Sequence, residues 1–233
     1  YSRGDLDGAA QSLTESAAIN VSPKYGALAR FWLGEIAFAR GDYAEAERRY
    51  KEYLHRAPRT EDEYAKAHYN LGYCYFDRGD MSNAYASFAR FNQLYSAADR
   101  YKADALNREA DARYSLRQFP AALATYEKAA AVGTNEKYYA DFQRAVTLGI
   151  LDRRGGLVAG VPRHIVARPC CRLAYIRGAL IAGGFVADPR GDFHLEIAVQ
   201  GEQYAKGLCD LLEQIGVHAR VNARRGSYAV YIK

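Results

Sequence analysis

An internal repeat with a step of 38 residues constrains the fold of this chain more than any other feature. Three segments share one pattern: LGEIAFARGDYAEAERRYKEY (33–53), LGYCYFDRGDMSNAYASFARF (71–91) and EADARYSLRQFPAALATYEKA (109–129). A small residue recurs in one slot of each segment, at Gly34, Gly72 and Ala110 (72 − 34 = 38 and 110 − 72 = 38). A period of this order predicts stacked supersecondary units, each of which buries its apolar face against its neighbours.

The Gly-Asp pairs at 41–42 and 79–80 predict a tight turn between the two helices of a unit. Glycine ends a helix without strain, and aspartate is a favoured N-cap of the helix that follows. The pattern predicts helices at Tyr25–Arg40, Tyr43–His55, Glu61–Arg78, Met81–Tyr95, Arg100–Leu116, Pro120–Ala131 and Glu136–Leu148. Gly4-Asp5-Leu6 aligns with Gly41-Asp42-Tyr43 at a distance of 37 residues (41 − 4 = 37), so we expect the chain to open on the second helix of a repeat whose first helix is absent.

The glycines at 34 and 72 lie in the middle of predicted helices, where glycine costs about 1 kcal/mol relative to alanine. This cost is explained if a neighbouring helix packs closely against them. The second helix of each unit offers a small residue and, four positions later, an aromatic ring that fills the gap between helices. These pairs are Ala46 with Tyr50, Ala84 with Phe88, and Ala122 with Tyr126.

These positions resemble tetratricopeptide (TPR) repeats over roughly residues 1–147. The matching residues are Leu33-Gly34, Tyr43, Ala46, Tyr50 and Pro58, then Leu71-Gly72, Tyr75, Ala84 and Phe88. The period of that family is about 34, so we expect the extra residues to lengthen loops at Thr60–Glu63 and Ser96–Asp99. The third unit departs from the pattern, with Glu109-Ala110 in place of Leu-Gly and Arg117 in place of the turn glycine.

TPR proteins commonly bind peptides in a groove that the first helices line, so the resemblance implies protein or peptide partners. It implies that ten side chains face such a groove: Phe31, Glu35, Phe38, Lys66, Tyr69, Tyr73, Phe76, Asn107, Asp111 and Tyr114. The alternative is that the aromatic members are ordinary stacking contacts between helices. No basic clamp for a C-terminal carboxylate stands out among them.

Charge separates the last third of the chain from the repeats. Residues 1–147 carry 20 Lys+Arg and 20 Asp+Glu, whereas residues 148–233 carry 12 and 7, a net charge of +5. Glycines and prolines then mark residues 148–169 as a connector. From residue 170 the pattern predicts an αββαββ order, an antiparallel sheet with helices on one face. The expected elements are helices Cys170–Gly183 and Glu202–Ile215, and strands Phe185–Ala187, Phe193–Gln200, Val217–Arg224 and Ser227–Lys233, with a turn at Asp188–Asp192.

This last part resembles the WhiA family, bacterial regulators of sporulation and cell division whose domain is related to LAGLIDADG homing endonucleases. The resemblance is carried by Cys170-Cys171-Arg172, Tyr175–Gly184, His194-Leu195-Glu196 and Ile215–Tyr231. It implies the second lobe of that domain, without the first lobe. The chain is therefore expected to be a multi-domain protein, an all-α TPR array followed by a small, incomplete α+β domain.

The resemblance also implies that nuclease activity is lost. In the endonucleases, the second acidic residue of the motif ends the helix and binds a divalent metal. Aligning Ile176–Gly184 on that motif puts Gly183 at the acidic position and Ile181 at the first acidic position. Glycine offers no carboxylate for a hard cation. Gly178 and Ala182 remain as a small-residue face, which we expect to pack on the repeats or on a second copy of the chain.

Five arginines of the last third are candidates for contacts with DNA phosphates: Arg172, Arg177, Arg220, Arg224 and Arg225. The alternative is a solvated basic face on a small domain. Four cysteines without ligand spacing predict neither a disulfide framework nor a metal site, and we expect no cofactor and no catalytic residue. Reduced thiols in the cytoplasm are the default for so few cysteines, so we expect a cytoplasmic protein. The longest strongly apolar run, Ala179–Ala187, is too short to span a bilayer.

Together these patterns predict a non-enzymatic adaptor with a nuclease-inactive regulatory domain, linked to DNA binding and to control of transcription or cell division. The alternative is a peptide-binding scaffold alone, with a C-terminal piece that is structural or a fusion fragment.

Overall fold

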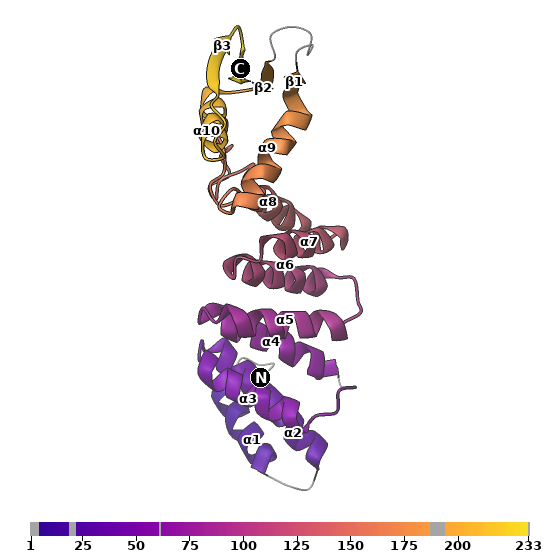
Figure 1. Cartoon of the computed structure of the whole chain (residues 1–233). Coiled ribbons are helices and arrows are strands. Elements are labelled where there is room, and N and C mark those ends of the chain that lie inside the picture. Colours follow the sequence, from indigo (N-terminus) through magenta and orange to yellow (C-terminus); the bar gives the residue numbers. More distant parts are fainter. Residues whose placement is uncertain (1–4, 19–21, 61, 187–193, 233) are drawn as a thin grey trace. The chain divides into compact units, whose positions relative to one another are not determined.

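The computed structural model of the chain describes residues 5–18, 22–60, 62–186 and 194–232. They form two compact units, Tyr1–Arg144 and Ala145–Lys233, which we call the N-terminal and C-terminal units (Figure 1). The division falls three residues before the boundary expected from charge (147 − 144 = 3). In the part of the chain that the structure describes, no helix combines the length and the apolar composition needed to cross a membrane.

The N-terminal unit is a succession of helices in chain order (Figure 1). They are α1 (Leu6–Ala18), α2 (Pro23–Ala39), α3 (Tyr43–Arg56), α4 (Asp62–Asp77), α5 (Met81–Leu94), α6 (Arg100–Ser115), α7 (Phe119–Ala131) and α8 (Lys137–Thr147), the last of which continues past the unit boundary. The seven helices expected from Tyr25 onward are confirmed, with ends that differ by no more than two residues. We call α2–α3, α4–α5 and α6–α7 the first, second and third repeats.

The turns inside the first two repeats have the geometry that the Gly-Asp pairs predict. Gly41 and Gly79 adopt φ angles of 76° and 77°, in the left-handed region that glycine reaches without strain. The Asp42 carboxylate accepts a hydrogen bond from the Glu45 N–H at 3.0 Å, and Asp80 caps α5 in the same way. In the third repeat Arg117 occupies the turn with a φ of 60°, which is uncommon for a residue with a side chain.

Close approach between helices explains the glycines in the middle of α2 and α4. A Cβ atom on Gly34 would lie 2.7 Å from the Tyr50 ring, and one on Gly72 would lie 2.7 Å from the Phe88 ring. Both rings are fully buried. The third repeat has Ala110 at this position and buries Tyr126 in the same cluster. The glycines therefore stay because the partner ring occupies the space of a side chain.

The C-terminal unit has the expected αββαββ order. Its elements are α9 (Pro169–Gly183), β1 (Gly184–Val186), β2 (Leu195–Val199), α10 (Glu202–Glu213), β3 (Arg220–Arg224) and β4 (Ser227–Ile232). The strands form an antiparallel sheet in the order β1-β2-β4-β3. Both helices pack on one face of this sheet, around a core that includes Ile176, Ile197, Leu208 and Val230. The turn expected at Asp188–Asp192 lies outside the described residues.

The segment before α9 contributes to this core. Val166 is buried in it, and Val161 and Ile165 pack against it. Arg172 of α9 donates hydrogen bonds to the Val166 and Ala167 carbonyl oxygens at 3.1 and 3.3 Å. The residues from Val161 to the start of α9 are therefore part of the C-terminal unit and are held by its packing.

Candidate functional site

A polar network on α6 connects this helix to α4, α7 and α8. The Asp104 carboxylate accepts hydrogen bonds from the Tyr69 and Tyr73 hydroxyls of α4, at 2.7 and 2.5 Å. Arg108, one turn along α6, lies 3.7 Å from Asp104 and forms an ion pair with Asp111 at 2.8 Å. The network thus couples α4 to α6 through residues that are more than 30 positions apart.

Asp111 is the buried end of this network, with 9% of its surface exposed. Its carboxylate accepts hydrogen bonds from Tyr126 of α7 at 2.5 Å and from Tyr139 of α8 at 2.9 Å. Burial raises the pKa of Asp111 even though Arg108 and the two hydroxyls favour its charged form. The Arg108 guanidinium also lies 4.7 Å from the centre of the Tyr139 ring, a cation–π contact. All of these contacts are internal, so Asp111 holds the array together.

The first repeat has an equivalent acid. Glu35 lies two steps before Asp111 (111 − 35 = 76 = 2 × 38) and accepts a hydrogen bond from Tyr50 at 2.6 Å. Asn70 of α4 also donates to it. Burial raises the pKa of Glu35, although the hydrogen bonds from Tyr50 and Asn70 favour its charged form. Each partly or fully buried acid of this series therefore has a hydroxyl donor from the second helix of its own repeat.

The structure places the ten expected groove residues in different environments. Phe31, Asn107 and Asp111 are buried, with 3%, 1% and 9% of their surface exposed. Phe31 packs on Tyr50, and Asn107 donates to the Glu136 carbonyl at 3.1 Å, so these side chains offer no surface to a ligand. The exposed or half-buried members are Glu35, Phe38, Lys66, Tyr69, Tyr73, Phe76 and Tyr114.

Sequence reasoning missed Asp104 and Arg108, which are half-buried members of the same surface. The signal was available, because Asp104 lies one step after Lys66 and Arg108 one step after Asn70 (66 + 38 = 104 and 70 + 38 = 108). The charge at both positions changes between repeats. A ligand that contacts this surface therefore meets a different polar pattern at the second and third repeats.

The C-terminal unit has a candidate nucleic-acid interface on the open face of its sheet. Along β3, Val221 packs against the core, whereas Arg220, Asn222 and Arg224 are exposed. Side chains alternate between the two faces of a strand, so these three polar residues lie on the face away from α9 and α10. Arg224 forms an ion pair with Glu196 of β2 at 2.5 Å.

Part of the expected arginine set lies on this face. Arg220, Arg224 and Arg225 belong to the β3–β4 hairpin, and Arg225 is exposed at its turn. Arg177 is exposed on α9, which packs on β1 and β2 on the other face, and Arg172 is bound to backbone carbonyls of the preceding segment. The structure therefore brings three of the five arginines together.

Aromatic side chains also lie on the open face of the sheet. Sequence reasoning did not identify them as part of this candidate interface. Phe185, Glu196 and Tyr231 are neighbours across β1, β2 and β4. The His194 ring lies 5.6 Å from Tyr231 and 6.4 Å from Phe185, and Phe185 is 62% exposed. The signal was the alternation in FHLEIAVQ (193–200), which sends His194 and Glu196 to the face opposite Leu195 and Ile197.

The end of α9 lies against the sheet backbone. A Cβ atom on Gly183 would lie 2.5 Å from the Ala198 carbonyl oxygen, so a side chain at Gly183 requires a backbone shift. No group of three or more His, Cys, Asp or Glu residues that could hold a metal ion occurs among the residues that the structure describes. On the outer side of the helix, Gly178 has open space around it and Ile181 is 88% exposed.

Family models match both the repeats and the C-terminal unit of the chain. Residues 172–233 match the family model of the WhiA LAGLIDADG-like domain. Residues 1–61 and 39–99 match the tetratricopeptide repeat model. The TPR-like array, the αββαββ unit and both family resemblances are thereby confirmed.

The curated relatives match only the last part of the chain. The probable cell division protein WhiA of Heliobacterium modesticaldum is 43% identical over 86 residues, which are 37% of this chain and 27% of that protein. The corresponding protein of Desulfitobacterium hafniense (strain Y51) is 41% identical over the same length, with the same coverage. The chain thus spans about a quarter of the length of the curated relatives that it matches.

Solved structures resemble the helical array. The TPR-like repeats of a putative kinesin light chain from Podosopora anserina superpose with a TM-score of 0.51 at 13% identity, covering 63% of this chain and 79% of that one. A point variant of the same protein gives a TM-score of 0.52 at 12% identity, with coverage of 78% and 89%. At this identity the likeness shows the fold alone. The chain combines TPR repeats with a WhiA-like domain, which supports an adaptor or regulatory role.

Proposed function

We propose that the chain is a non-enzymatic adaptor. Its repeats bind a protein partner, and its WhiA-like domain binds DNA without cleaving it. The name of the relatives, probable cell division protein, supports a role in the control of transcription or cell division. The alternative is a peptide-binding scaffold in which the C-terminal unit is structural.

The open face of the sheet is the observation that carries the proposal. It presents Arg220, Asn222 and Arg224 in a row along one edge strand, with Arg225 at the adjacent turn. Exposed arginines contact phosphates, and a two-stranded β-ribbon fits the major groove of B-DNA. The net charge of +5 on residues 148–233 favours approach to a polyanion.

The carboxylate of Glu196 sets the charge of this face. Arg224 neutralises it through the ion pair at 2.5 Å. Without Arg224, Glu196 would present an uncompensated negative charge to the phosphates. Arg224 therefore has two roles in the proposal, as a phosphate ligand and as the partner that masks Glu196.

Fluorescence anisotropy of the whole chain with a labelled duplex at low salt tests DNA binding. Replacing Arg220 or Arg225 with Ala should each weaken binding and lower the slope of log K against log salt by about 0.9 for each phosphate that is no longer neutralised. Arg224→Ala should weaken binding more than either. Arg177→Ala is the matched control, because it removes an exposed arginine of the same unit from the other side of the sheet.

Two results would contradict the DNA-binding proposal. One is the absence of binding at low salt, which favours the scaffold alternative. The other is an equal loss of affinity in Arg177→Ala, which means that general charge and not this face attracts the duplex.

The close approach at Gly183 supports the absence of nuclease activity. The position that carries a metal-binding acid in the endonucleases has no carboxylate here and no space for one. Incubation with supercoiled plasmid and Mg²⁺ or Mn²⁺ should give no nicking. Metal-dependent cleavage that Asp188→Asn abolishes would overturn the proposal; Asp188 lies outside the described residues.

The outer side of α9 supports a second activity, self-association. Ile181 is 88% exposed, and Gly178, three residues earlier, has open space in which a second helix fits. Sedimentation velocity should show a concentration-dependent dimer that Ile181→Glu removes. A monomer at all concentrations would exclude this activity.

A further inference from the structure

The third repeat differs from the second at positions that pack between repeats. Leu71 and Tyr75 of α4 are buried in the main core, Leu54 of α3 packs against that core, and Tyr64 of α4 is also buried. One step later the chain has Asn92, Lys102, Glu109 and Arg113 (54, 64, 71 and 75 + 38). Four apolar or aromatic residues are thus replaced by four polar or charged ones. Burying charged groups between helices is costly unless they are paired.

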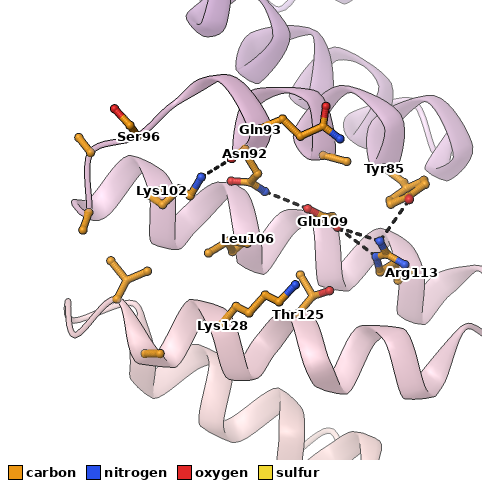
Figure 2. Close-up of a pocket in the computed structure, with 15 residues that line it drawn as sticks. Tyr85, Asn92, Gln93, Ser96, Lys102, Leu106, Glu109, Arg113, Thr125 and Lys128 are labelled. Atoms are coloured by element: carbon orange, nitrogen blue, oxygen red, sulfur yellow. Dashed lines mark hydrogen bonds and ion pairs between the residues drawn. The ribbon is translucent and has the colours of Figure 1, made fainter.

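A pocket of about 590 Å³ lies at this altered interface. Figure 2 shows α6 between α5 and α7, with Lys102, Glu109 and Arg113 along α6, Asn92 on α5, and Lys128 with Thr125 on α7. Alanines of α5, α7 and the Ser96–Ala98 loop, together with Leu106 and Val132, supply the apolar part of the lining. The pocket therefore combines charged walls with small apolar surfaces.

The single acid of the lining is already neutralised. Glu109 forms an ion pair with Arg113 at 3.0 Å and accepts a hydrogen bond from Asn92 at 2.9 Å. Arg113 also donates to the Tyr85 hydroxyl at 3.1 Å. Glu109 is 7% exposed, so it contributes little negative charge to the space of the pocket.

Neither lysine of the lining forms an ion pair in the part of the chain that the structure describes, although Glu109 is near enough to Lys102 to favour its charged form. The Lys102 ammonium donates to the Tyr95 carbonyl at 2.8 Å and to the Asn92 carbonyl, and Lys128 is exposed on the opposite helix. Three cations and one anion leave the lining with a net charge of +2 (3 − 1), counted from its residues. Burial lowers the pKa of Lys102, and a bound anion would offset that effect.

We propose that this pocket binds an acidic peptide segment of a partner protein. Lys128 and Lys102 would hold carboxylates of the peptide, and the alanines with Leu106 and Val132 would accept its aliphatic side chains. The volume is within the range of sites for ligands much larger than a single anion. The pocket lies between α5, α6 and α7, and none of its lining residues is among the ten residues of the groove expected along the first helices.

Reversing the charge at Lys128 distinguishes binding in this pocket from general electrostatic attraction of acidic peptides to the chain. A display library of random 12-residue peptides should be selected on the whole chain, and the enriched peptides measured by fluorescence anisotropy. We expect peptides rich in Asp and Glu whose affinity falls at least tenfold in Lys128→Glu. Lys51→Glu is the matched control, because Lys51 is an exposed lysine on α3, the second helix of the first repeat, and no residue of the pocket lining belongs to that helix. It should change affinity less than twofold.

A second variant tests the pocket itself without changing charge. Ala131→Trp fills the pocket from its exposed edge and should weaken the same peptides at least tenfold, whereas Ala86→Trp, on α5 outside the pocket, should not. Thermal melts verify that all variants fold. The proposal is overturned if the enriched peptides are neutral or basic, if Lys51→Glu weakens them as much as Lys128→Glu, or if Lys66→Glu and not Lys128→Glu removes binding.

Discussion

The second and third repeats solve one packing problem in two ways. In the second repeat, Gly72 lets the Phe88 ring approach α4, and Tyr73 meets that ring edge to face with centres 5.2 Å apart. In the third repeat, Ala110 takes the glycine position, and Asp111 accepts a hydrogen bond from Tyr126. Every repeat has an aromatic ring at this position of its second helix. Whether it carries a hydroxyl follows from whether its partner on the first helix is an acid.

This comparison teaches that substitutions within a repeat occur in matched sets. The first repeat agrees with the third, since Glu35 is paired with Tyr50. A buried acid without its hydroxyl would be left partly unsatisfied, and a hydroxyl without an acid would lack its partner. Substitutions at the ring, at the acid with its hydroxyl donor and at the turn test the comparison between the repeats, from the largest expected effect to the smallest.

Removing the ring of the second repeat should have the largest effect. Phe88→Ala should lower the free energy of unfolding by about 3–5 kcal/mol, because the ring is fully buried between helices. Gly72→Ala should cost about 1–3 kcal/mol, because its Cβ would lie 2.7 Å from that ring. Urea unfolding followed by circular dichroism measures both. If neither variant changes the midpoint, the assigned alignment of the repeats is wrong.

Removing one hydroxyl from the third repeat should have a smaller effect. Tyr126→Phe keeps the ring and leaves the buried carboxylate of Asp111 with fewer donors, which should cost about 1–3 kcal/mol. Tyr85→Phe serves as the control, because that hydroxyl contacts the half-buried Arg113 and no buried acid. An equal loss in both variants would show that the acid–hydroxyl pairing has no special weight.

The pH dependence of the free energy of unfolding should show that Asp111 has a raised pKa in the folded chain. Burial raises the pKa of Asp111 in the folded state, so the folded chain binds more protons than the unfolded chain over that range. The contribution of this group to stability is therefore present at low pH and is lost as pH rises through the folded pKa. Asp111→Asn should reduce this decline and leave the part that comes from Glu35, whose pKa burial also raises, whereas Glu127→Gln, at an exposed position of α7, should leave the decline unchanged. Free energies of unfolding measured at a series of pH values compare the slopes. A slope unchanged in Asp111→Asn would contradict the assignment.

The turn of the third repeat should give the smallest effect, with the opposite sign. Arg117 has a φ of 60°, where the first two repeats have Gly41 and Gly79. Arg117→Gly should stabilise the chain by about 0.5–1 kcal/mol, because glycine adopts this conformation without strain. Gly79→Ala should destabilise it by a similar amount. A shift of the melting temperature in the same direction for both variants would show that the turn conformation does not decide stability.

The sequence by itself determined the elements and their order. The 38-residue step predicted the helices from α2 onward, because one set of local signals, the turn glycine, the capping aspartate and the helical spacing of apolar residues, recurs in phase. The period-two alternation in residues 193–200 indicates that Leu195, Ile197 and Val199 of β2 share one face of the strand. These features depend on neighbours within a few positions, so they can be read along the chain.

Only the tertiary structure decided which polar residues are buried and which are on the surface. Phe31, Asn107 and Asp111 occupy repeat positions typical of a peptide groove, yet packing from α3, α7 and α8 buries them. Asp104 receives hydrogen bonds from residues 31 and 35 positions earlier, and Gly183 is constrained by a carbonyl oxygen of β2. The pocket at the third repeat likewise depends on three helices at once. Burial and pairing arise from contacts between distant segments, and helical spacing alone contains no information about which distant partner a side chain meets.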